Sequence, residues 1–410
     1  MSQSANQPVA GKPSLESCST IGLLGGGQLG MFFTQAAQKL GYRVVCFCQR
    51  EDEPVGKFAD ELVLAPFDDP SAIKAFVEKC NVVTYEFESI PPATLEAVDQ
   101  HCTLRPSLHI IHTTQNRAKE KTFLQESGIP TSPFAIVTTR EELEAGVTKL
   151  GGDTVLKTSS GGYDGKGQWS LTPDSDLDAI WEATKGRPCT LESRIDLAFE
   201  CSMIVAGDCD GNRSIIGPIQ NEHRNHILDV SFVEHDIPKD VLSKAQSITA
   251  RVADHFGLVG TICIEFFISK SGDVLVNEIA PRPHNSGHLT IDAFSLSQFD
   301  LQALAASGQP VPTSEEVRPA AMVNLLGELW LNKAPDFQLA EQAVKRDGYA
   351  THLHLYGKKE ARPGRKMGHV TVVGESQKQV IADALLFRAQ LESTTGEALD
   401  VLMNEEQNAN

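Results

Sequence analysis

The chain has 410 residues, enough for two or three domains, and its composition excludes several classes of protein. Hydrophobic residues make up 41% and charged residues 22%, close to the averages of globular proteins, so neither a disordered chain nor a fibrous repeat is predicted. The 36 Lys and Arg residues and 54 Asp and Glu residues give a net charge of −18. A chain this acidic repels a phosphate backbone, so we expect no nucleic-acid partner, and an anionic ligand would need a local cluster of positive charge.

The nine cysteines are odd in number and scattered, without a Cys-x-x-Cys pair, and they indicate free thiols rather than disulfides or a zinc site. No apolar run is long enough to cross a membrane. The first 19 residues are polar and lack the apolar core of a signal peptide, so we expect a disordered leader there. These features predict a cytoplasmic protein that does not bind a membrane.

Strands and helices alternate through residues 20–116, which predicts a doubly wound domain with a parallel sheet. The apolar run Ile21–Leu24 predicts a strand that meets the glycines of GGGQLG, and helical spacing follows over Met31–Leu40. Further elements are expected as strands at Arg43–Cys48, Leu62–Leu64 and Val82–Thr84 and as a helix near Ser71–Lys79.

The pattern changes at Asn116 and predicts a second domain over residues 117–310. Helices are expected at Ala118–Glu126, near Ser175–Thr184 and at Pro238–His255. Strands are expected at Phe134–Val137, at TVLK (154–157), at the end of SSGGYDGKGQWSL (159–171), and as a pair at Cys189–Glu192 and Glu200–Val205. Thr261–Ser269 and Asp273–Ala280 predict a hairpin with a two-residue turn at Ser271-Gly272.

A linker is predicted at Gln309–Val317, followed by a smaller third domain over residues 311–392 and a polar tail over residues 393–410. The strands of this third domain are expected at Ala321–Leu325, Thr351–Tyr356 and His369–Val373.

Three glycines, Gly25, Gly27 and Gly30, follow the spacing of a dinucleotide-binding turn between a strand and a helix. Free N–H groups and the dipole at a helix N-terminus favour an anion. Glu51 could supply the acid that a dinucleotide site needs after its second strand. This motif alone leaves open a nicotinamide-dependent dehydrogenase and a tight turn that binds nothing.

A second glycine-rich loop, Gly161–Gly167, holds four glycines and Lys166 and follows a strand that ends in Lys157. It lacks the residue order of a P-loop, but flexible backbone donors and two lysines suit a polyphosphate. A plain hairpin loop is the alternative.

The predicted turn at Ser271-Gly272 places Glu265 opposite Glu278, with Cβ atoms about 4.5–5.5 Å apart. Two facing carboxylates destabilise a sheet unless a cation bridges them or one is protonated. Because the adjacent Asn277 adds a further oxygen, Mg²⁺ is the cation that this pair predicts. In the alternative, the register is shifted and both acids are solvated.

A rigid polar stretch, Ala280–His288 (APRPHNSGH), follows the second of these strands. Its Arg282 could neutralise charge on a transferring phosphoryl group. The segment Lys358–Lys366 holds five cations and one acid, and its Pro363-Gly364 turn suits a phosphate monoester. A solvated surface is the alternative for that segment.

Together these motifs resemble the ATP-grasp superfamily, and within it the 5-(carboxyamino)imidazole ribonucleotide synthases of purine biosynthesis. The resemblance runs from about residue 19 to about residue 374 through GGGQLG, TYEFESIP, GGYDGKGQ, NEHRNHIL, IEFF, VNEIAPRPHNSGH and RPGRKMGH. It implies an α/β and α+β fold: an N-terminal Rossmann-like pre-ATP-grasp domain, a central ATP-grasp domain with a mobile lid at about residues 153–206, and a small β-rich C-terminal domain.

The resemblance also implies the ligands. ATP would contact Arg117, Lys157, Gly162, Tyr163, Asp164, Gly165, Lys166, Gly167, Gln168, Glu192, Ser193, Arg194, Ile195, Glu200, His223, Asn277 and Glu278. Glu265 and Glu278 would hold Mg²⁺, which Mn²⁺ could replace. The 5-aminoimidazole ribonucleotide would contact Gln28, Leu29, Glu88, Asn285, Ser286, Lys358, Arg365 and Lys366. A homodimer is the family expectation.

The reaction implied is attack of bicarbonate on the γ-phosphate of ATP, breakdown of the carboxyphosphate to CO₂, and capture of CO₂ by the exocyclic amine. The catalytic residues would be Tyr163, Asp164, Lys166, Arg282, His284 and Asn285. Arg282 and Lys166 would stabilise the phosphoryl and carboxyphosphate oxygens, while Tyr163, Asp164 and His284 orient bicarbonate and handle the amine proton. The alternatives are a formate-dependent glycinamide ribonucleotide transformylase, the dehydrogenase, and a nucleotide sensor without catalysis.

Overall fold

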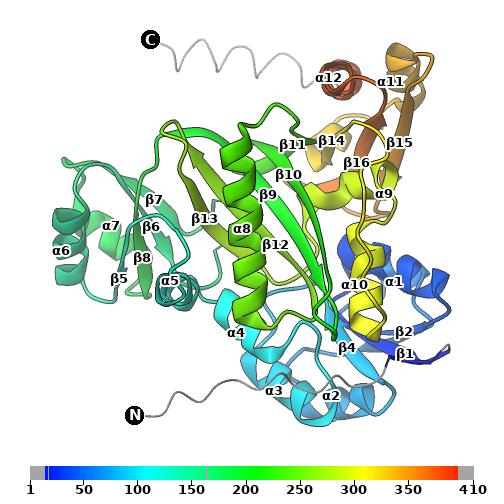
Figure 1. The fold of residues 1–410 in the computed structure, drawn as a ribbon, viewed down its shortest axis with the longest axis horizontal. Helices are drawn as coiled ribbons and strands as arrows, with labels where there is room; N and C mark the ends of the chain where they lie inside the picture. The colour runs from blue at the N-terminus through cyan, green and yellow to red at the C-terminus, as the bar shows by residue number, and fades with distance from the viewer. Residues whose placement is uncertain (1–13, 17, 163–164, 396–410) are drawn as a thin grey trace.

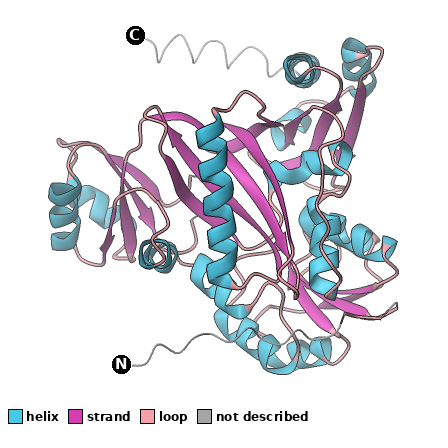
Figure 2. Cartoon of the chain, in the orientation of Figure 1, coloured by secondary structure: helices cyan, strands magenta, loops and turns pink. Residues whose placement is uncertain are grey.

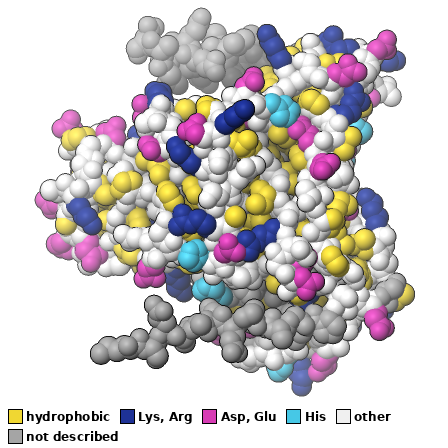
Figure 3. Space-filling view, viewed as in Figure 1, with side chains coloured by type: hydrophobic (Ala, Val, Ile, Leu, Met, Phe, Trp, Pro, Cys, Tyr) yellow, Lys and Arg dark blue, Asp and Glu magenta, His cyan; other side chains and the backbone are white. Residues whose placement is uncertain are grey.

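The computed structural model describes residues 14–16, 18–162 and 165–395. Their strands form three sheets, and Figure 1 and Figure 2 show these strands with the helices around them. Within the described ranges, no helix is both long and apolar enough to cross a lipid bilayer. On the visible face, acidic and basic side chains are interspersed with one another and with hydrophobic ones (Figure 3).

The first sheet is parallel and has the order β3-β2-β1-β4. Its strands are β1 (Thr20–Leu24), β2 (Arg43–Cys48), β3 (Glu61–Leu64) and β4 (Val82–Tyr85). The helices beside it are α1 (Gln28–Lys39), α2 (Pro70–Val77), α3 (Pro92–His101) and α4 (Leu108–Thr114). The predicted strands, α1 and α2 are confirmed. β1 and β4 are almost fully buried, as expected for parallel strands covered on both faces.

The largest sheet is antiparallel and has the order β13-β12-β9-β10-β11-β14-β16-β15. Its first five strands are β9 (Leu197–Gly207), β10 (Arg213–Arg224), β11 (Ile227–Val233), β12 (Gly260–Ser269) and β13 (Val274–Ala280). The C-terminal strands are β14 (Ala320–Leu326), β15 (Ala350–Leu355) and β16 (Lys366–Val373). Because β14 pairs with β11, the sheet is continuous from the middle of the chain into its C-terminal part.

The third sheet has the order β5-β8-β6-β7 and lies to one side of the molecule with α6 (Arg140–Leu150) and α7 (Leu177–Thr184) (Figure 1). Its strands are β5 (Phe134–Val137), β6 (Thr154–Thr158), β7 (Gln168–Leu171) and β8 (Cys189–Ser193). The predicted pairing of Cys189–Glu192 with Glu200–Val205 is wrong, because β8 and β9 belong to different sheets. Leu191 of β8 packs in the small core of this sheet, whereas Met203 of β9 packs under α8.

The remaining helices cover the sheets or join them. They are α5 (Arg117–Glu126), α8 (Lys239–Phe256), α9 (Thr290–Ala293), α10 (Gln298–Ser307), α11 (Phe337–Val344) and α12 (Gln377–Thr395). The sequence patterns predict α5 and α8 but not α10. Since α10 is buried nearly all round, it lacks the one-sided apolar stripe that reveals a surface helix.

A column of histidines joins the first domain to the C-terminal strands. His369 of β16 stacks on His288 at a centroid distance of 4.8 Å and on His354 of β15 at 4.5 Å. The ring of Phe32 in α1 contacts all three histidines edge-on. The Tyr356 hydroxyl lies 2.8 Å from His369 Nδ1. This column holds the N-terminal helix, the segment after β13 and the C-terminal strands in one packed junction.

Asp292 lies beside this column and pairs with two of its neighbouring histidines. Its carboxylate lies 2.9 Å from His354 Nε2 and 3.4 Å from His352 Nδ1. Ligand atoms of Asp292, His354 and His369 lie within 4.8 Å of one another, and the rings of His354 and His369 are stacked within 18° of parallel. The arrangement is that of a packing junction.

The junction makes stability depend on pH. Burial, followed by neighbouring positive charge, holds the pKa values of His288 and His369 well below the usual range. A group with a lowered pKa in the folded state binds fewer protons than it does when unfolded, so its stabilisation is lost as pH falls below about 6.5. Each histidine should contribute a slope of about 1.4 kcal/mol per pH unit to the unfolding free energy.

We therefore predict that His288→Asn flattens the fall in unfolding free energy between pH 6.5 and pH 5.5, measured by urea denaturation. His101→Asn, at an exposed position of α3, is the control and should leave the slope unchanged. An unchanged slope in the His288 variant would contradict the prediction.

Candidate functional site

The first glycine turn encloses carboxylates rather than an empty anion site. Gly27 N–H at the start of α1 donates to Glu86 Oε1 at 2.6 Å. A Cβ on Gly25, whose φ is 103°, would lie 2.7 Å from the same oxygen, and one on Gly26 would lie 2.6 Å from Glu53 Oε2. Burial raises the pKa of Glu86. These acids occupy the place where a dinucleotide needs its pyrophosphate, which argues against the dehydrogenase alternative.

Three basic side chains lie next to this turn, on the C-terminal side of the molecule. Lys358 Nζ donates to Gln28 Oε1 at 2.9 Å and to Lys366 O at 2.7 Å. Burial, together with the charges of Arg365 and Lys366, lowers the pKa of Lys358 to about 8. The structure thus brings the predicted Gln28, Lys358, Arg365 and Lys366 together. Leu29 is buried in the core of the first domain, so its side chain is a packing residue.

The segment after β13 also approaches the first domain. Arg282 Nη2 lies 2.9 Å from Glu88 Oε1, which joins two predicted site residues. Asn285 is 8% exposed, and within the described chain neither polar atom of its side chain has a hydrogen-bond partner. A buried amide left unpaired is costly, so a ligand group is its natural partner. Ser286 Oγ lies 2.9 Å from His284 Nδ1 and 2.7 Å from Ser202 Oγ.

The pairing of Glu265 with Glu278 is confirmed, but the predicted two-residue turn is wrong. Ser269 N–H donates to Asp273 O at 3.0 Å and Gly272, with φ at 83°, donates to Ser269 O at 2.9 Å. A two-residue turn would pair Ile268 with Leu275. In the structure Ile268 pairs with Val274, so the longer turn shifts the register of the hairpin by one residue.

A bulge restores the predicted register nearer the site. Phe266 pairs with Val276 while Glu265 pairs with Glu278, so Asn277 is the extra residue of β13. Such a bulge re-aims side chains, and Asn277 and Glu278 are both partly exposed between buried neighbours on either side. The bulge therefore presents an amide and a carboxylate together.

Each carboxylate of the pair has a cationic partner. Glu265 Oε1 lies 2.9 Å from His284 Nε2, and Glu278 Oε2 accepts from Arg117 Nη2 at 2.6 Å. Burial opposes the charged form of His284, but the Cys263 sulfur and the Glu265 carboxylate outweigh burial and raise its pKa to about 10. The raised pKa favours the imidazolium form, in which Nε2 can donate to the Glu265 carboxylate.

Lys157, which belongs to β6 of the third sheet, extends toward Asn277 of β13. Its Nζ lies 3.2 Å from Glu192 Oε1 and 3.5 Å from Asn277 Oδ1. Burial lowers its pKa, although the Glu192 carboxylate opposes this. The Glu192 side chain, predicted to contact ATP, is 2% exposed and is enclosed by Arg117, Lys121 and Lys157.

The second glycine loop lies between β6 and β7, which pair antiparallel. Thr158 N–H donates to Gly167 O at 2.9 Å, and Gln168 pairs with Lys157. Gly161, Gly165 and Gly167 have positive φ values near 70°, which only glycine adopts readily. Gly162 and Lys166 lie in this loop, whereas Tyr163 and Asp164 lie outside the described residues.

Two further parts of the predicted ATP set are the Glu200–His223 pair on β9 and β10 and the connector between β8 and β9. His223 Nδ1 lies 2.8 Å from Glu200 Oε2. Burial on its own would lower the pKa of His223, but the hydrogen bond to the Glu200 carboxylate outweighs burial and raises that pKa. Ser193 N–H donates to Pro133 O and Arg194 N–H to Asp153 O. Arg194 and Ile195 line a hollow of about 300 Å³ with residues of the β12–β13 turn.

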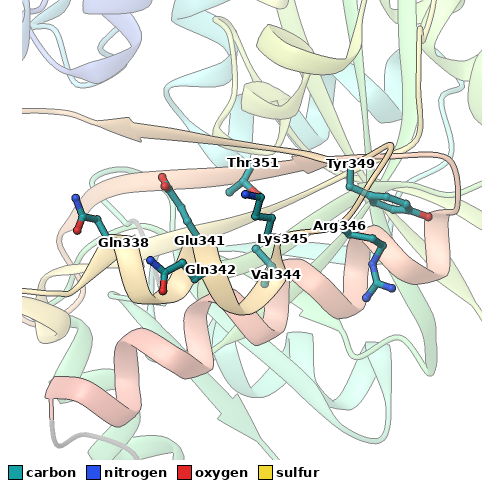
Figure 4. A pocket seen from close by; sticks show the side chains of 8 residues that line it. All are labelled: Gln338, Glu341, Gln342, Val344, Lys345, Arg346, Tyr349 and Thr351. Carbon is teal, nitrogen blue, oxygen red and sulfur yellow. The ribbon is translucent and has the colours of Figure 1, made fainter.

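Sequence reasoning did not identify Glu86, Glu120 or Lys121, although all three are buried against the site. The regular spacing of Arg117, Glu120 and Lys121 on one helix face is the signal that could have found the last two. A separate hollow of about 540 Å³ lies on the C-terminal part, between α11 and β15, and none of the predicted site residues lines it (Figure 4).

Comparisons with known proteins agree with this arrangement. Residues 18–115 match the ribonucleotide synthetase preATP-grasp domain, residues 122–299 the ATP-grasp domain, and residues 320–383 the phosphoribosylaminoimidazole carboxylase C-terminal domain. The N5-carboxyaminoimidazole ribonucleotide synthase of Bacillus subtilis (strain 168) is 36% identical over 365 residues, which cover 89% of this chain and 94% of that protein. The enzyme of the same name from Staphylococcus epidermidis (strain ATCC 12228 / FDA PCI 1200) is 38% identical over 364 residues, 88% of this chain and 94% of its own.

Solved structures are similar over the same length. The N5-carboxyaminoimidazole synthetase from Staphylococcus aureus complexed with ADP has a TM-score of 0.85 at 35% identity, covering 94% of this chain and 100% of that one. The synthase from Aspergillus clavatus in complex with ADP and 5-aminoimidazole ribonucleotide has a TM-score of 0.81 at 27% identity, covering 92% and 99%. The chain therefore belongs to the N5-carboxyaminoimidazole ribonucleotide synthase family of ATP-grasp ligases.

Proposed function

We propose that this chain uses ATP and bicarbonate to carboxylate the exocyclic amine of 5-aminoimidazole ribonucleotide, giving 5-(carboxyamino)imidazole ribonucleotide, ADP and phosphate in purine biosynthesis. One observation carries the proposal: β13 and the segment after it connect a polyphosphate half-site to a ribonucleotide half-site. Glu278 contacts Arg117 at one end, and Arg282 contacts Glu88 at the other.

The polyphosphate half-site consists of backbone and cationic groups from both central sheets. Arg117 and Lys157, with the glycine loop around Lys166, supply positive charge for the phosphates of ATP. The connector Ser193–Ile195 and the Glu200–His223 pair would contact the nucleoside part. The ADP and ATP complexes of family members support ATP as the nucleotide that binds.

Glu265, Glu278 and Asn277 fit a Mg²⁺ ion, for which Mn²⁺ could substitute. The bulge places oxygen donors side by side, and carboxylate and carbonyl oxygens are the ligands that Mg²⁺ prefers. When bound, such an ion neutralises charge on phosphate oxygens. The Glu278 side chain is 40% exposed, so a ligand can reach it from solvent.

The ribonucleotide half-site would hold its 5′-phosphate with Lys358, Arg365 and Lys366. Gln28, Glu88, Asn285 and Ser286 would contact the rest of the nucleotide, and Asn285 has two unpaired polar atoms for this purpose. The complex of the Aspergillus clavatus synthase with 5-aminoimidazole ribonucleotide supports a ribonucleotide as the second substrate.

In the proposed reaction, a bicarbonate oxygen attacks the γ-phosphorus and ADP leaves. The carboxyphosphate then breaks to CO₂ and phosphate, and the exocyclic amine bonds to the CO₂ carbon and loses a proton. Arg282 and Lys166 would neutralise the phosphoryl and carboxyphosphate oxygens. Because the Cys263 sulfur and the Glu265 carboxylate raise the pKa of His284, it suits neutralisation of these anions better than acceptance of the amine proton. Asn285 would orient the reacting groups, as would Tyr163 and Asp164, which lie outside the described residues.

We also propose domain boundaries at residues 20–116, 117–310 and 311–392, with a lid at about 153–206, a homodimer, and a cytoplasmic location. The family-model matches at residues 18–115, 122–299 and 320–383 support the division into three domains. The curated relatives named N5-carboxyaminoimidazole ribonucleotide synthase favour carboxylation over the formate-dependent transformylase.

The proposed function predicts which substrates are needed for the release of phosphate from ATP. Release should require both 5-aminoimidazole ribonucleotide and bicarbonate, with one ADP formed per carboxylated product. Formate with glycinamide ribonucleotide should give no more than the background rate. Release that depends on formate, or no release with any pair of substrates, would contradict the proposal.

The metal site predicts that Glu278→Gln raises the Mg²⁺ concentration for half-maximal activity at least tenfold, because one of two facing carboxylates loses its charge. The measurement is the rate of phosphate release against Mg²⁺ concentration. Glu341→Gln, at an exposed position of α11, should leave the Mg²⁺ requirement unchanged. The same Mg²⁺ requirement in both variants would show that Glu278 holds no metal.

The basic cluster predicts that Lys358→Met raises the KM for the ribonucleotide about tenfold or more, because losing a hydrogen bond to a charged group costs about 1.5–3 kcal/mol. The KM for ATP should change less than twofold. Lys359→Met is the matched control, since the Lys359 side chain is 75% exposed. Equal effects of the two substitutions would place the phosphate elsewhere.

A further inference from the structure

One face of α5 lies between the two central sheets. Arg117, Glu120 and Lys121 are three and four residues apart, so they share this face. Glu120 is 2% exposed and Lys121 is fully buried. A buried lysine is rare unless it is paired, so its partners reveal what it holds in place.

The first partner of this face is β13, the edge strand that carries Asn277 and Glu278. Ile279 N–H donates to Glu120 Oε1 at 2.6 Å. Val276 O accepts from Thr131 Oγ1 at 2.7 Å and from Lys121 Nζ at 3.4 Å. The free edge of the strand is therefore hydrogen-bonded to α5 and to the segment after it rather than to another strand.

The second partner is β8 of the small sheet. Lys121 Nζ lies 3.1 Å from Glu192 Oε2, and Ser132 Oγ donates to the same oxygen at 2.8 Å. Lys121 also donates to Thr131 Oγ1 at 2.7 Å and to Ser132 Oγ at 3.3 Å. One ammonium group thus joins the edge of the large sheet to a carboxylate of the small sheet.

Glu192 is shared among three cations that differ in their surroundings. Its Oε1 lies 3.2 Å from Lys157 and 3.8 Å from Arg117, both of which are partly exposed toward the polyphosphate half-site. Burial alone would raise the pKa of Glu192, but Lys121, then Lys157, then Arg117 hold it well below the usual range. Only Lys121 is fully buried, so only Lys121 is out of reach of a phosphate.

The balance of charges around Glu192 shows why the burial of Lys121 is important. Three cations, Arg117, Lys121 and Lys157, surround the Glu192 carboxylate, and Arg117 also pairs with Glu278. A phosphate that enters must draw Lys157 and Arg117 away from Glu192. If Lys121 were absent, Glu192 would need those two cations to offset its burial, because an unpaired buried charge is strongly destabilising.

We propose that Lys121 is a positioning residue that serves as the permanent counter-ion of Glu192 and thereby frees Lys157 and Arg117 to bind the phosphates of ATP. The inference rests on the proposed function, since it takes the polyphosphate half-site as the place where ATP binds. Lys121 touches no substrate and acts through Glu192.

The test is a set of steady-state measurements in which ATP and the ribonucleotide are varied separately. Lys121→Met should raise the KM for ATP at least tenfold and change the KM for the ribonucleotide less than threefold. Lys119→Met, at an exposed position of the same helix, is the control and should match the wild type.

The double variant Lys121→Met/Glu192→Gln tests whether Lys121 acts as the counter-ion of Glu192 or only fills space in the core. It removes both charges, so no carboxylate competes for Lys157 and Arg117, and its KM for ATP should be clearly lower than that of Lys121→Met. It also keeps the test valid if the single variant does not fold, because replacing a whole buried pair is far better tolerated than breaking it.

Two results would overturn the inference: equal rises in both KM values, or a double variant no better than Lys121→Met. Wild-type protein without activity toward 5-aminoimidazole ribonucleotide would instead refute the proposed function. The two failures are therefore distinguishable within one experiment.

Discussion

The hydrogen-bonded pairing of β12 with β13 is the constraint on which the site depends. It sets Glu265 opposite Glu278, and the bulge at Asn277 turns two adjacent oxygen-bearing side chains toward the same region. The continuation of β13 carries Arg282, His284 and Asn285 toward the ribonucleotide half-site, where Arg282 contacts Glu88. A shift of one residue in this ladder would separate the carboxylates and misplace the segment that follows.

Local charge explains how an acidic chain can bind two anionic nucleotides. The net charge of −18 describes the whole chain, but each half-site is a region where cations exceed the acids that face them. At the polyphosphate half-site the excess comes from Arg117, Lys121 and Lys157 around Glu192. At the other half-site, Lys358, Arg365 and Lys366 lie near Gln28, while Glu86 holds the start of α1.

Local patterns in the sequence predicted the parallel sheet, most strands of the central region and the facing carboxylates. The carboxylate pairing was predicted from a two-residue turn that does not exist, and it holds because the longer turn and the bulge shift the register in opposite directions. The separation of β8 from β9 could not be predicted, since three intervening residues fit a hairpin as well as a change of sheet. Glu86, Lys121 and the histidine column depend on contacts between residues far apart in the chain, which no local pattern contains.

The central claim is that the two half-sites act on one shared intermediate made from bicarbonate and ATP. The most direct measurement is the fate of oxygen from ¹⁸O-labelled bicarbonate during turnover with 5-aminoimidazole ribonucleotide. If a bicarbonate oxygen attacks the γ-phosphorus, each released phosphate carries one ¹⁸O atom, because that oxygen stays with phosphorus when CO₂ forms. Carboxylated product accompanied by unlabelled phosphate would contradict the account.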